Sequence, residues 1–238
     1  IGLEAAGQAG ITVSNCPEYS ARSVAEHVFA LLLAVNRKLL QADRTVRQGG
    51  RHVYPPFLAM ELAGKTLGLI GTGKIGRAVA GIAHGFGMNV IGTNRSGRAA
   101  PGIAWREMSE LMRQSDVVSL HVPFQPENEG MISSRLLSLM KRTAVFINTS
   151  RAGLVDEEAL FQMLRERKIA GAGLDDAAKP PDHPLYKLDN VVFTPGTAWY
   201  TDTSREANMT EILENVKACI QGFPRNVVNA EYVNRSLQ

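Results

Sequence analysis

Three glycines, Gly71, Gly73 and Gly76, have the spacing G-x-G-x-x-G, which can cradle a phosphate. A sharp turn from strand to helix favours glycine at the first position, and a pyrophosphate can approach the backbone only where the second position lacks a Cβ. The third glycine lets helix and strand pack closely, and the first N–H groups of the helix then face the anion. Because 22 glycines in 238 residues can also produce this spacing in an ordinary loop, the flanking residues decide its meaning.

The flanking pattern favours dinucleotide binding over a plain glycine-rich loop. Apolar residues before the glycines predict a buried strand over 65–71, and apolar residues at helical spacing after them predict a helix over 74–86. A second strand is expected over 88–94. In this setting Lys74 and Ile75, at the start of the helix, become candidate phosphate contacts together with the three glycines.

Strands and helices then alternate along the chain. We expect helices near 107–115 and over 133–141 and 156–168, and strands over 117–122, 143–148, 170–175 and 190–194. Such alternation predicts an α/β fold with a doubly wound parallel sheet of the Rossmann type, with helices on both faces. Ligands of these sheets lie beyond the carboxyl ends of the strands, so the residues that follow each strand are the ones to consider.

Outside this core we expect a short strand over 11–15, one long helix over 20–47 and a final helix over 204–221. The arm between 52 and 64 contains Pro55 and Pro56, which forbid regular helix. Its aromatic side chains suit packing against a partner, but a loop folded onto its own domain explains them equally well.

Composition excludes several classes of protein. With 26 Lys+Arg against 23 Asp+Glu, the net charge of +3 is too small and too evenly spread to favour nucleic acid. The longest apolar run is too short for a membrane span, and Cys16 and Cys219 lack C-x-x-C spacing, which is typical of reduced thiols in a cytoplasmic protein. His27, His52, His84 and His121 show no metal-ligand spacing, and no G-x-S-x-G motif is present. The chain begins with Ile1 rather than Met, so we expect an N-terminal truncation.

The end of the second strand bears on cofactor choice. An acid usually contacts the adenosine ribose there, but this chain has Asn94, followed by Arg95, Ser96 and Arg98. An acid would repel a 2′-phosphate, whereas Arg95 would pair with it. The sequence therefore favours NADP(H) and leaves NAD(H) as the alternative; solvent-facing arginines on a loop are the simpler explanation of the same residues.

Several segments together resemble the D-isomer-specific 2-hydroxyacid dehydrogenases, which include phosphoglycerate, glycerate and hydroxypyruvate enzymes. In chain order these segments are SARSVAEHVFALLLAVNR, ELAGKTLGLIGTGKIG, SDVVSLHVPFQPEN, INTSRAGLVDEEAL, AGAGLDDA and LDNVVFTP. The resemblance implies an oxidoreductase that transfers hydride between a nicotinamide and a small 2-keto or 2-hydroxy acid. It also implies a homodimer, with the arm between 52 and 62 near the interface.

The resemblance implies a division of the chain as well. Residues 1–20 would be the remnant of a flavodoxin-like substrate domain, most of which is absent from this sequence. Residues 21–200 would form the NAD(P)-binding Rossmann domain, and residues 201–238 a C-terminal helix and tail that return toward the substrate domain.

By the same resemblance, Arg151 would bind the substrate carboxylate and carbonyl, since a guanidinium offers the bidentate fork that a planar anion needs. The implied cofactor contacts are Gly71, Gly73, Lys74, Ile75, Gly76, Asn94, Arg95, Ser96, Val122, Pro123, Asn128, Thr149, Ser150, Arg151, Asp175 (at the carboxamide) and Gly196. A salt bridge beside a helix would equally explain Arg151, and a helix cap Asp175. The position of both after predicted strands favours the site.

The sequence departs from the family at its acid–base pair. The family has a histidine directly after Thr-Pro, whereas Gly196 follows Thr194 and Pro195 here. The partner glutamate aligns with Pro180; a shift of one residue offers Lys179 or Pro181, and only a shift of two reaches Asp182. Proton donation contributes about 10²–10⁴-fold to rate, so its loss slows hydride transfer without abolishing it.

Lys179, His183 and Tyr200 are the nearest alternative donors in sequence. Two hypotheses follow: an NADP(H)-preferring reductase with an atypical proton donor, or a catalytically impaired dinucleotide-binding protein that acts as a sensor or interaction module.

Overall fold

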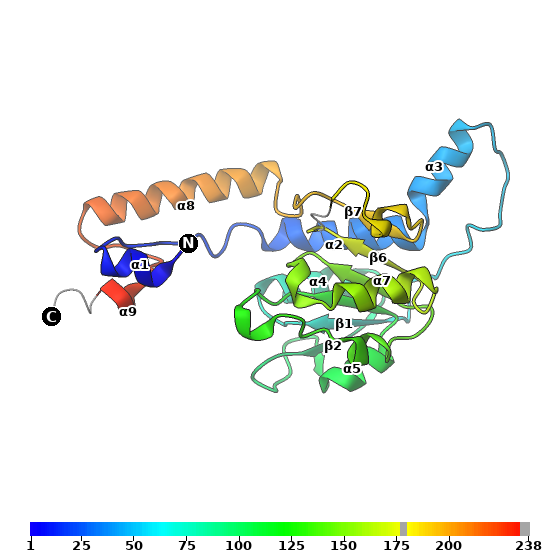
Figure 1. Ribbon diagram of the computed structural model, residues 1–238, viewed down its shortest axis with the longest axis horizontal. Coiled ribbons are helices and arrows are strands. Elements are labelled where there is room, and N and C mark those ends of the chain that lie inside the picture. The colour runs from blue at the N-terminus through cyan, green and yellow to red at the C-terminus, as the bar shows by residue number, and fades with distance from the viewer. Residues whose placement is uncertain (177–179, 234–238) are drawn as a thin grey trace. The chain divides into compact units, whose positions relative to one another are not determined.

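A computed structural model of the chain describes residues 1–176 and 180–233 (Figure 1). It divides into two compact units. One, here called the sheet unit, runs from Ala21 to Trp199, and the other, the terminal unit, combines Ile1–Ser20 with Tyr200–Gln238.

The sheet unit is built on a seven-stranded sheet in the order β3-β2-β1-β4-β5-β6-β7, and every pair of neighbouring strands is parallel. This confirms the doubly wound parallel sheet predicted from the sequence. The strand order reverses between β1 and β4, which is where such sheets open a crevice for a ligand. The strands are β1 (Thr66–Ile70), β2 (Asn89–Thr93), β3 (Ala104–Trp105), β4 (Val117–Leu120), β5 (Val145–Asn148), β6 (Gly171–Leu174) and β7 (Val191–Phe193).

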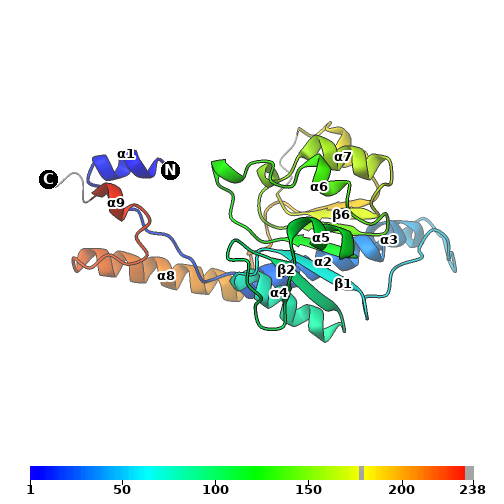
Figure 2. The same cartoon turned by 90° about the horizontal axis from the view of Figure 1, so that it is seen from below.

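Helices cover both faces of the sheet (Figures 1 and 2). The alternation of side chains along a strand explains the two cores: Phe146 of β5 packs into the core beneath α5, α6 and α7, and its neighbour Ile147 packs into the core beneath α2 and α4. The helices are α2 (Ala21–Asn36), α3 (Leu39–Arg47), α4 (Lys74–Gly85), α5 (Met108–Gln114), α6 (Ser134–Leu137) and α7 (Glu157–Arg165), with 3₁₀ turns η1 (Pro126–Asn128), η2 (Ala152–Leu154) and η3 (Pro184–Lys187).

The terminal unit contains α1 (Leu3–Gln8), α8 (Asp202–Ile220) and α9 (Ala230–Val233). The first and last of these pack so closely that a Cβ on Gly7 would lie 2.3 Å from the Cβ of Tyr232. Asn229 is fully buried and joins the segments, because its Oδ1 accepts from the N–H of Val13 (2.8 Å) and its Nδ2 donates to the carbonyl of Ile11 (2.9 Å).

The structure corrects three of the predicted elements and adds one strand. The expected strand over 11–15 is reduced to a single bridge between Ser14 and Val227. The expected helix over 20–47 is two helices, because Lys38 takes a left-handed conformation (φ 52°) that ends the first and begins the second. The helix expected over 133–141 covers only Ser134–Leu137, and the two-residue strand β3 was not predicted.

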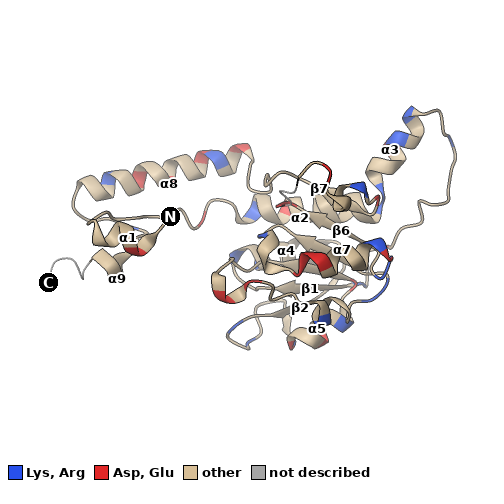
Figure 3. Ribbon diagram, viewed as in Figure 1, with Lys and Arg blue, Asp and Glu red and all other residues tan. Residues whose placement is uncertain are grey.

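The arm after α3 is fixed at its far end. Asn36 of α2 bonds both the carbonyl and the N–H of Met60 (2.7 and 3.0 Å), while Tyr54 and Leu58 are exposed. Figure 3 shows Lys and Arg mixed with Asp and Glu over the elements, as the small net charge implies. Within the described ranges, no helix is both long enough and apolar enough to cross a membrane.

Candidate dinucleotide and substrate site

The last residues of most strands in the sheet pair with one another, so these strands end side by side. Ile70 pairs with Thr93 and Leu120, Leu120 with Asn148, Asn148 with Leu174, and Leu174 with Phe193. The residues that follow these strands therefore lie along the same edge of the sheet. That row contains Gly71, His121, Thr149, Asp175 and Thr194.

The three glycines after β1 lack a side chain for different reasons. Gly71 has φ +99°, and a Cβ on it would lie 2.4 Å from the carbonyl oxygen of His121. A Cβ on Gly76 would lie 2.2 Å from the carbonyl oxygen of Gly71. The fold itself therefore requires these two glycines. Gly73 has an ordinary φ of −71°, and a Cβ on it would have no atom within 4 Å, so the space beside it is open to a ligand.

Two further features fit an anionic dinucleotide. Gly73 is the N-cap of α4, and no side chain caps this 12-residue helix, so its positive end faces the open space. Thr149, directly after β5, has a buried Oγ1 without a hydrogen-bond partner in the described part of the chain. Buried polar atoms normally have partners, so this hydroxyl fits a ligand contact. When bound, such a dinucleotide supplies a hydride.

Asn94 shapes the loop after β2. Its Nδ2 donates to Thr72 Oγ1 (2.8 Å) and to the carbonyl of Arg98 (2.7 Å), and its Oδ1 accepts from Ser96 Oγ (2.8 Å). The loop is thereby tied to the glycine turn. The side chain of Arg95 is exposed and makes no hydrogen bond or ion pair with any residue in the described ranges, so its guanidinium is available to a phosphate.

Arg151 stands on a rigid turn after β5. Buried Asn148 donates to the carbonyl of Arg151 (3.0 Å) and accepts from the N–H of Ser150 (2.9 Å). Asp176 accepts from the N–H of Ala152 (3.3 Å) on the other side of the turn. The Arg151 side chain is exposed, and one of its N–H groups bonds the carbonyl of Ser150 (2.8 Å). Its other donors have no partner among residues 1–176 and 180–233.

Asn128, a predicted cofactor contact, lies in the loop after β4. Asn128 donates to the carbonyl of Pro123 (2.9 Å) and accepts from the N–H of Gln125 (2.8 Å). Both halves of its amide thus close its own loop. Val122 lies nearer the site, since its side chain would be 3.0 Å from a Cβ on Gly71.

Asp175 organises the end of β6 and β7. Its carboxylate is buried and accepts from Thr194 Oγ1, from the N–H of Thr197 (3.0 Å) and from the N–H of Ala198 (2.9 Å). Burial opposes ionisation, but hydrogen bonds from His27, Thr194 and the two N–H groups outweigh it and lower the pKa of Asp175. The carboxylate therefore stays charged and holds the segment that contains Gly196.

His27 joins this cluster, and it was not among the predicted site residues. Its Nε2 lies 2.9 Å from Thr194 Oγ1 and 3.5 Å from Asp175 Oδ1. No motif connects these residues, since His27 and Thr194 are 167 positions apart. The one available signal was a polar residue on the buried face of a helix otherwise lined by Val24, Val28 and Leu31.

A second unpredicted histidine, His121, lies beside the glycine turn. Its Nε2 bonds Ser119 Oγ (2.9 Å), and its buried Nδ1 has no partner in the described residues. Burial lowers the pKa of His121 to about 3, so the ring is neutral near neutral pH.

Gly196 provides no proton donor. It has φ +73° and is exposed, and a Cβ on it would lie 3.7 Å from the carbonyl oxygen of Asp175. Of the alternative donors, His183 caps η3 by accepting from the N–H of Leu185 (3.2 Å), Tyr200 belongs to the terminal unit, and Lys179 lies outside the described residues.

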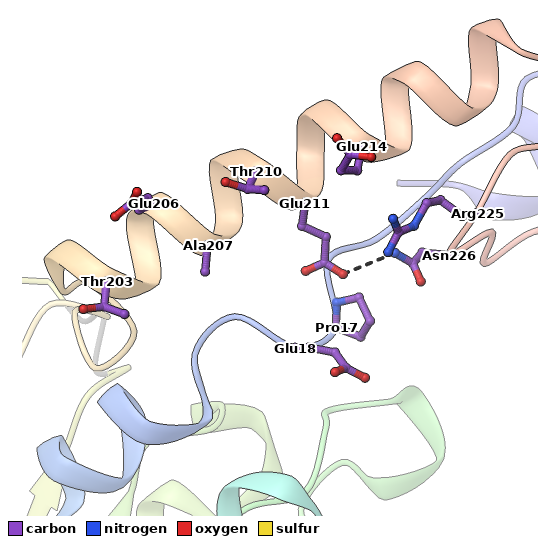
Figure 4. A pocket seen from close by; sticks show the side chains of 10 residues that line it. All are labelled: Pro17, Glu18, Thr203, Glu206, Ala207, Thr210, Glu211, Glu214, Arg225 and Asn226. Atoms are coloured by element: carbon purple, nitrogen blue, oxygen red, sulfur yellow. Dashed lines mark hydrogen bonds between the residues drawn. The ribbon is translucent and has the colours of Figure 1, made fainter.

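Two other kinds of site were considered, a metal site and a groove in the terminal unit. Within the described ranges, no three His, Cys, Asp or Glu side chains cluster in a way that could hold a metal ion. A groove in the terminal unit is lined by acidic side chains, among them Glu18, Glu206 and Glu211, and by Arg225 (Figure 4). None of the predicted site residues lines it.

Comparison with known proteins gives a consistent set of matches. Residues 29–198 match the family described as "D-isomer specific 2-hydroxyacid dehydrogenase, NAD binding domain". A glyoxylate reductase of Korarchaeum cryptofilum is 40% identical over 98% of this chain and 74% of its own length.

Two solved structures are also similar. An acyclic imino acid reductase in complex with NADPH and D-Arg is 51% identical with a TM-score of 0.92, covering 96% of this chain and 74% of that one. A D-lactate dehydrogenase from Aquifex aeolicus, complexed with NAD and lactic acid, is 34% identical with a TM-score of 0.85, covering 99% and 75%.

Proposed function

The chain belongs to the D-isomer specific 2-hydroxyacid dehydrogenase family, and from this premise we propose that it is an NADP(H)-dependent reductase of 2-imino acids. The observation that carries the proposal is Gly196. It stands where the family's acid–base histidine is expected, and no side chain there can donate a proton.

The chemistry of the two candidate substrates differs at this point. Hydride addition to a 2-keto acid puts negative charge on the carbonyl oxygen, which needs a proton donor as the charge develops. In an iminium ion the nitrogen already carries its proton. The new C–H bond takes the hydride's electron pair, the C=N π electrons become the nitrogen lone pair, and the resulting amine takes a proton from water. A site without a donor therefore suits the imine.

The similar proteins support the same choice. The matched imino acid reductase is 51% identical to this chain, compared with 34% for the D-lactate dehydrogenase and 40% for the glyoxylate reductase. Arg151 suits either substrate, because imino and keto acids share the 2-carboxylate that a guanidinium binds. Its exposed side chain on a fixed turn is consistent with that role.

An NADPH oxidation assay tests the substrate class. We expect little turnover with pyruvate, glyoxylate or hydroxypyruvate alone and saturable turnover when methylamine is added to form the imine. Arg151→Ala should abolish this turnover, and Arg151→Lys, which keeps the charge but loses the fork, should retain part of it.

Two other outcomes of this assay would favour different functions. Equal rates with and without amine would instead support 2-keto acid reduction with another proton donor. NADPH binding without turnover on either substrate would support the sensor or interaction protein.

Gly196→His tests the missing histidine directly. The positive φ strains any side chain at this position. We therefore expect the variant to gain less than about tenfold in its rate on keto acids, well below the usual contribution of a general acid.

Cofactor preference rests on Arg95. We expect tighter binding of NADPH than of NADH, because a charge-assisted contact with the 2′-phosphate is worth about 1.5–3 kcal/mol. Arg95→Ala should therefore weaken NADPH binding at least about tenfold and leave NADH binding unchanged. Isothermal titration calorimetry measures both affinities. The matched control is Arg135→Ala, which removes an exposed arginine on α6. Tighter binding of NADH by the unmodified protein would contradict the preference.

A further inference from the structure

His27, Thr194 and Asp175 form a hydrogen-bonded chain with a definite direction. The Thr194 hydroxyl donates its one proton to Asp175 Oδ1. It must then accept from the His27 Nε2 that lies 2.9 Å away, so this nitrogen carries a hydrogen. The chain runs from the imidazole of α2 through the hydroxyl after β7 to the buried carboxylate after β6.

The cluster contains two groups that can carry a charge, the carboxylate of Asp175 and the imidazole of His27. Asp175 is 4% exposed, and His27 is the one ionisable side chain recorded within reach of its carboxylate in the described residues. The other charged groups of α2, and those of the helices α3 and α4 that pack against it, are exposed: Arg22, Glu26, Asp43, Arg44, Arg47, Lys74, Arg77 and His84. Asp176, next to Asp175, is bound to the N–H of Ala152. Protonated His27 makes the cluster neutral, and neutral His27 leaves one negative charge.

The sheet topology places this charge on the nicotinamide side of a bound dinucleotide. The pyrophosphate position at Gly73 and the adenosine loop at Asn94 use the ends of β1 and β2. The strand order reverses between β1 and β4, and a dinucleotide lies across that crevice. Its other half must therefore lie over the ends of β4 to β7, where Asp175 and Thr194 are.

The two redox forms of the ring differ by one charge, since an oxidised nicotinamide is a cation and a reduced one is neutral. We propose that His27 is a positioning residue that couples its own protonation to the redox state of the bound cofactor. Neutral His27 leaves the Asp175 charge free to favour the oxidised ring. Protonated His27 cancels that charge and favours the reduced ring. The proposal rests on the dinucleotide site of the proposed function and is independent of the substrate.

Histidine is suited to this role in a way that other donors are not. A glutamine at position 27 could also bond the Thr194 hydroxyl, but only an imidazole changes its charge between about pH 5 and 8. Because glutamine would keep that hydrogen bond, the fold needs a donor at this position but not one that titrates.

The experiment measures the dissociation constants of NADPH and NADP⁺ by isothermal titration calorimetry from about pH 5 to about pH 8. The ratio of the two constants is the readout, because both forms carry the same phosphates, whose own titration near about pH 6 then cancels. We expect the affinity for NADP⁺ relative to NADPH to rise about five- to tenfold across this range, a coupling of ordinary size.

The variants isolate the imidazole. His27→Gln should make the ratio independent of pH while NADPH still binds, and Thr194→Val should reduce the pH dependence by cutting the chain. Glu26→Gln, an exposed neighbour on the same helix, should behave as the unmodified protein. Thr194→Ser, which keeps the hydroxyl, should retain the pH dependence if Thr194→Val fails to fold.

A flat ratio in the unmodified protein would overturn the proposal, as would an unchanged pH dependence in His27→Gln. Failure to bind either dinucleotide would overturn both this inference and the proposed cofactor. A pH-dependent ratio in a protein that turns over no imine would leave the inference standing and remove only the proposed substrate.

Discussion

Gly73 differs from its two neighbouring glycines in what its missing side chain leaves room for. At Gly71 and Gly76 a Cβ would collide with backbone carbonyl oxygens of the protein itself. At Gly73 it would meet nothing, and the helix that starts there has no side-chain cap. The contrast separates residues that the fold requires from a residue that only a ligand requires.

This contrast predicts opposite phenotypes for two conservative changes. Gly73→Ala should change the free energy of unfolding by no more than about 1 kcal/mol, yet weaken NADPH binding at least about tenfold, because the new methyl group would occupy the pyrophosphate's place. Gly71→Ala should lower the free energy of unfolding by more than about 2 kcal/mol through the strained φ and the clash with His121.

Urea denaturation and isothermal titration on the same samples give both quantities. If Gly73→Ala binds NADPH as well as the unmodified protein does, the pyrophosphate does not lie at the start of α4.

At the scale of elements, the sequence predicted most of the sheet because its central strands are largely apolar runs buried on both faces. In β4, β5 and β6 every residue is buried, which is the pattern that a parallel sheet imposes. The break between α2 and α3 was missed because apolar residues at helical spacing continue through it. Only the left-handed backbone at Lys38 interrupts the helix, and a lysine gives no hint of that conformation. Strand β3 was missed because two residues are too few to show a period.

The site was predictable only as far as it depends on local sequence. Glycine spacing and the residues after strands located the edge of the sheet and the Arg151 turn. His27 could not be found this way, because α2 brings it to Thr194 and Asp175 through tertiary packing. The contacts expected at Asn94 and Asn128 remain predictions. In the structure both side chains form hydrogen bonds within their own loops.

For the whole molecule, stability in acid depends on a few buried groups in the sheet unit. Burial opposes ionisation of Asp116, but bonds from the N–H of Thr66 and from Lys141 lower its pKa, as the contacts around Asp175 lower that of Asp175. Such carboxylates stabilise the fold above their ordinary pKa of 3.8, and this contribution is lost as the pH falls through their lower folded pKa. The pH dependence of stability that they cause is thus confined to strongly acid solution.

His121 acts in a separate and higher range of pH. Its pKa falls from 6.5 to about 3 on burial, so between these values the unfolded chain takes up a proton that the folded protein does not. Stability must therefore fall as the pH drops through that range, by at most about 1.4 kcal/mol per pH unit from this one group.

We expect His121→Gln, which cannot take up the proton in either state, to flatten the pH dependence of the unfolding free energy between the ordinary pKa of histidine, 6.5, and that of the carboxylates, 3.8. Glutamine can still bond Ser119, so the variant should fold, and any constant loss of stability does not alter the slope. Urea denaturation at several pH values measures it, with His52→Gln, an exposed histidine, as the control that should keep the original slope. An equal slope in the unmodified protein and His121→Gln would mean that the imidazole is protonated in the folded state, and that its buried Nδ1 has a partner after all.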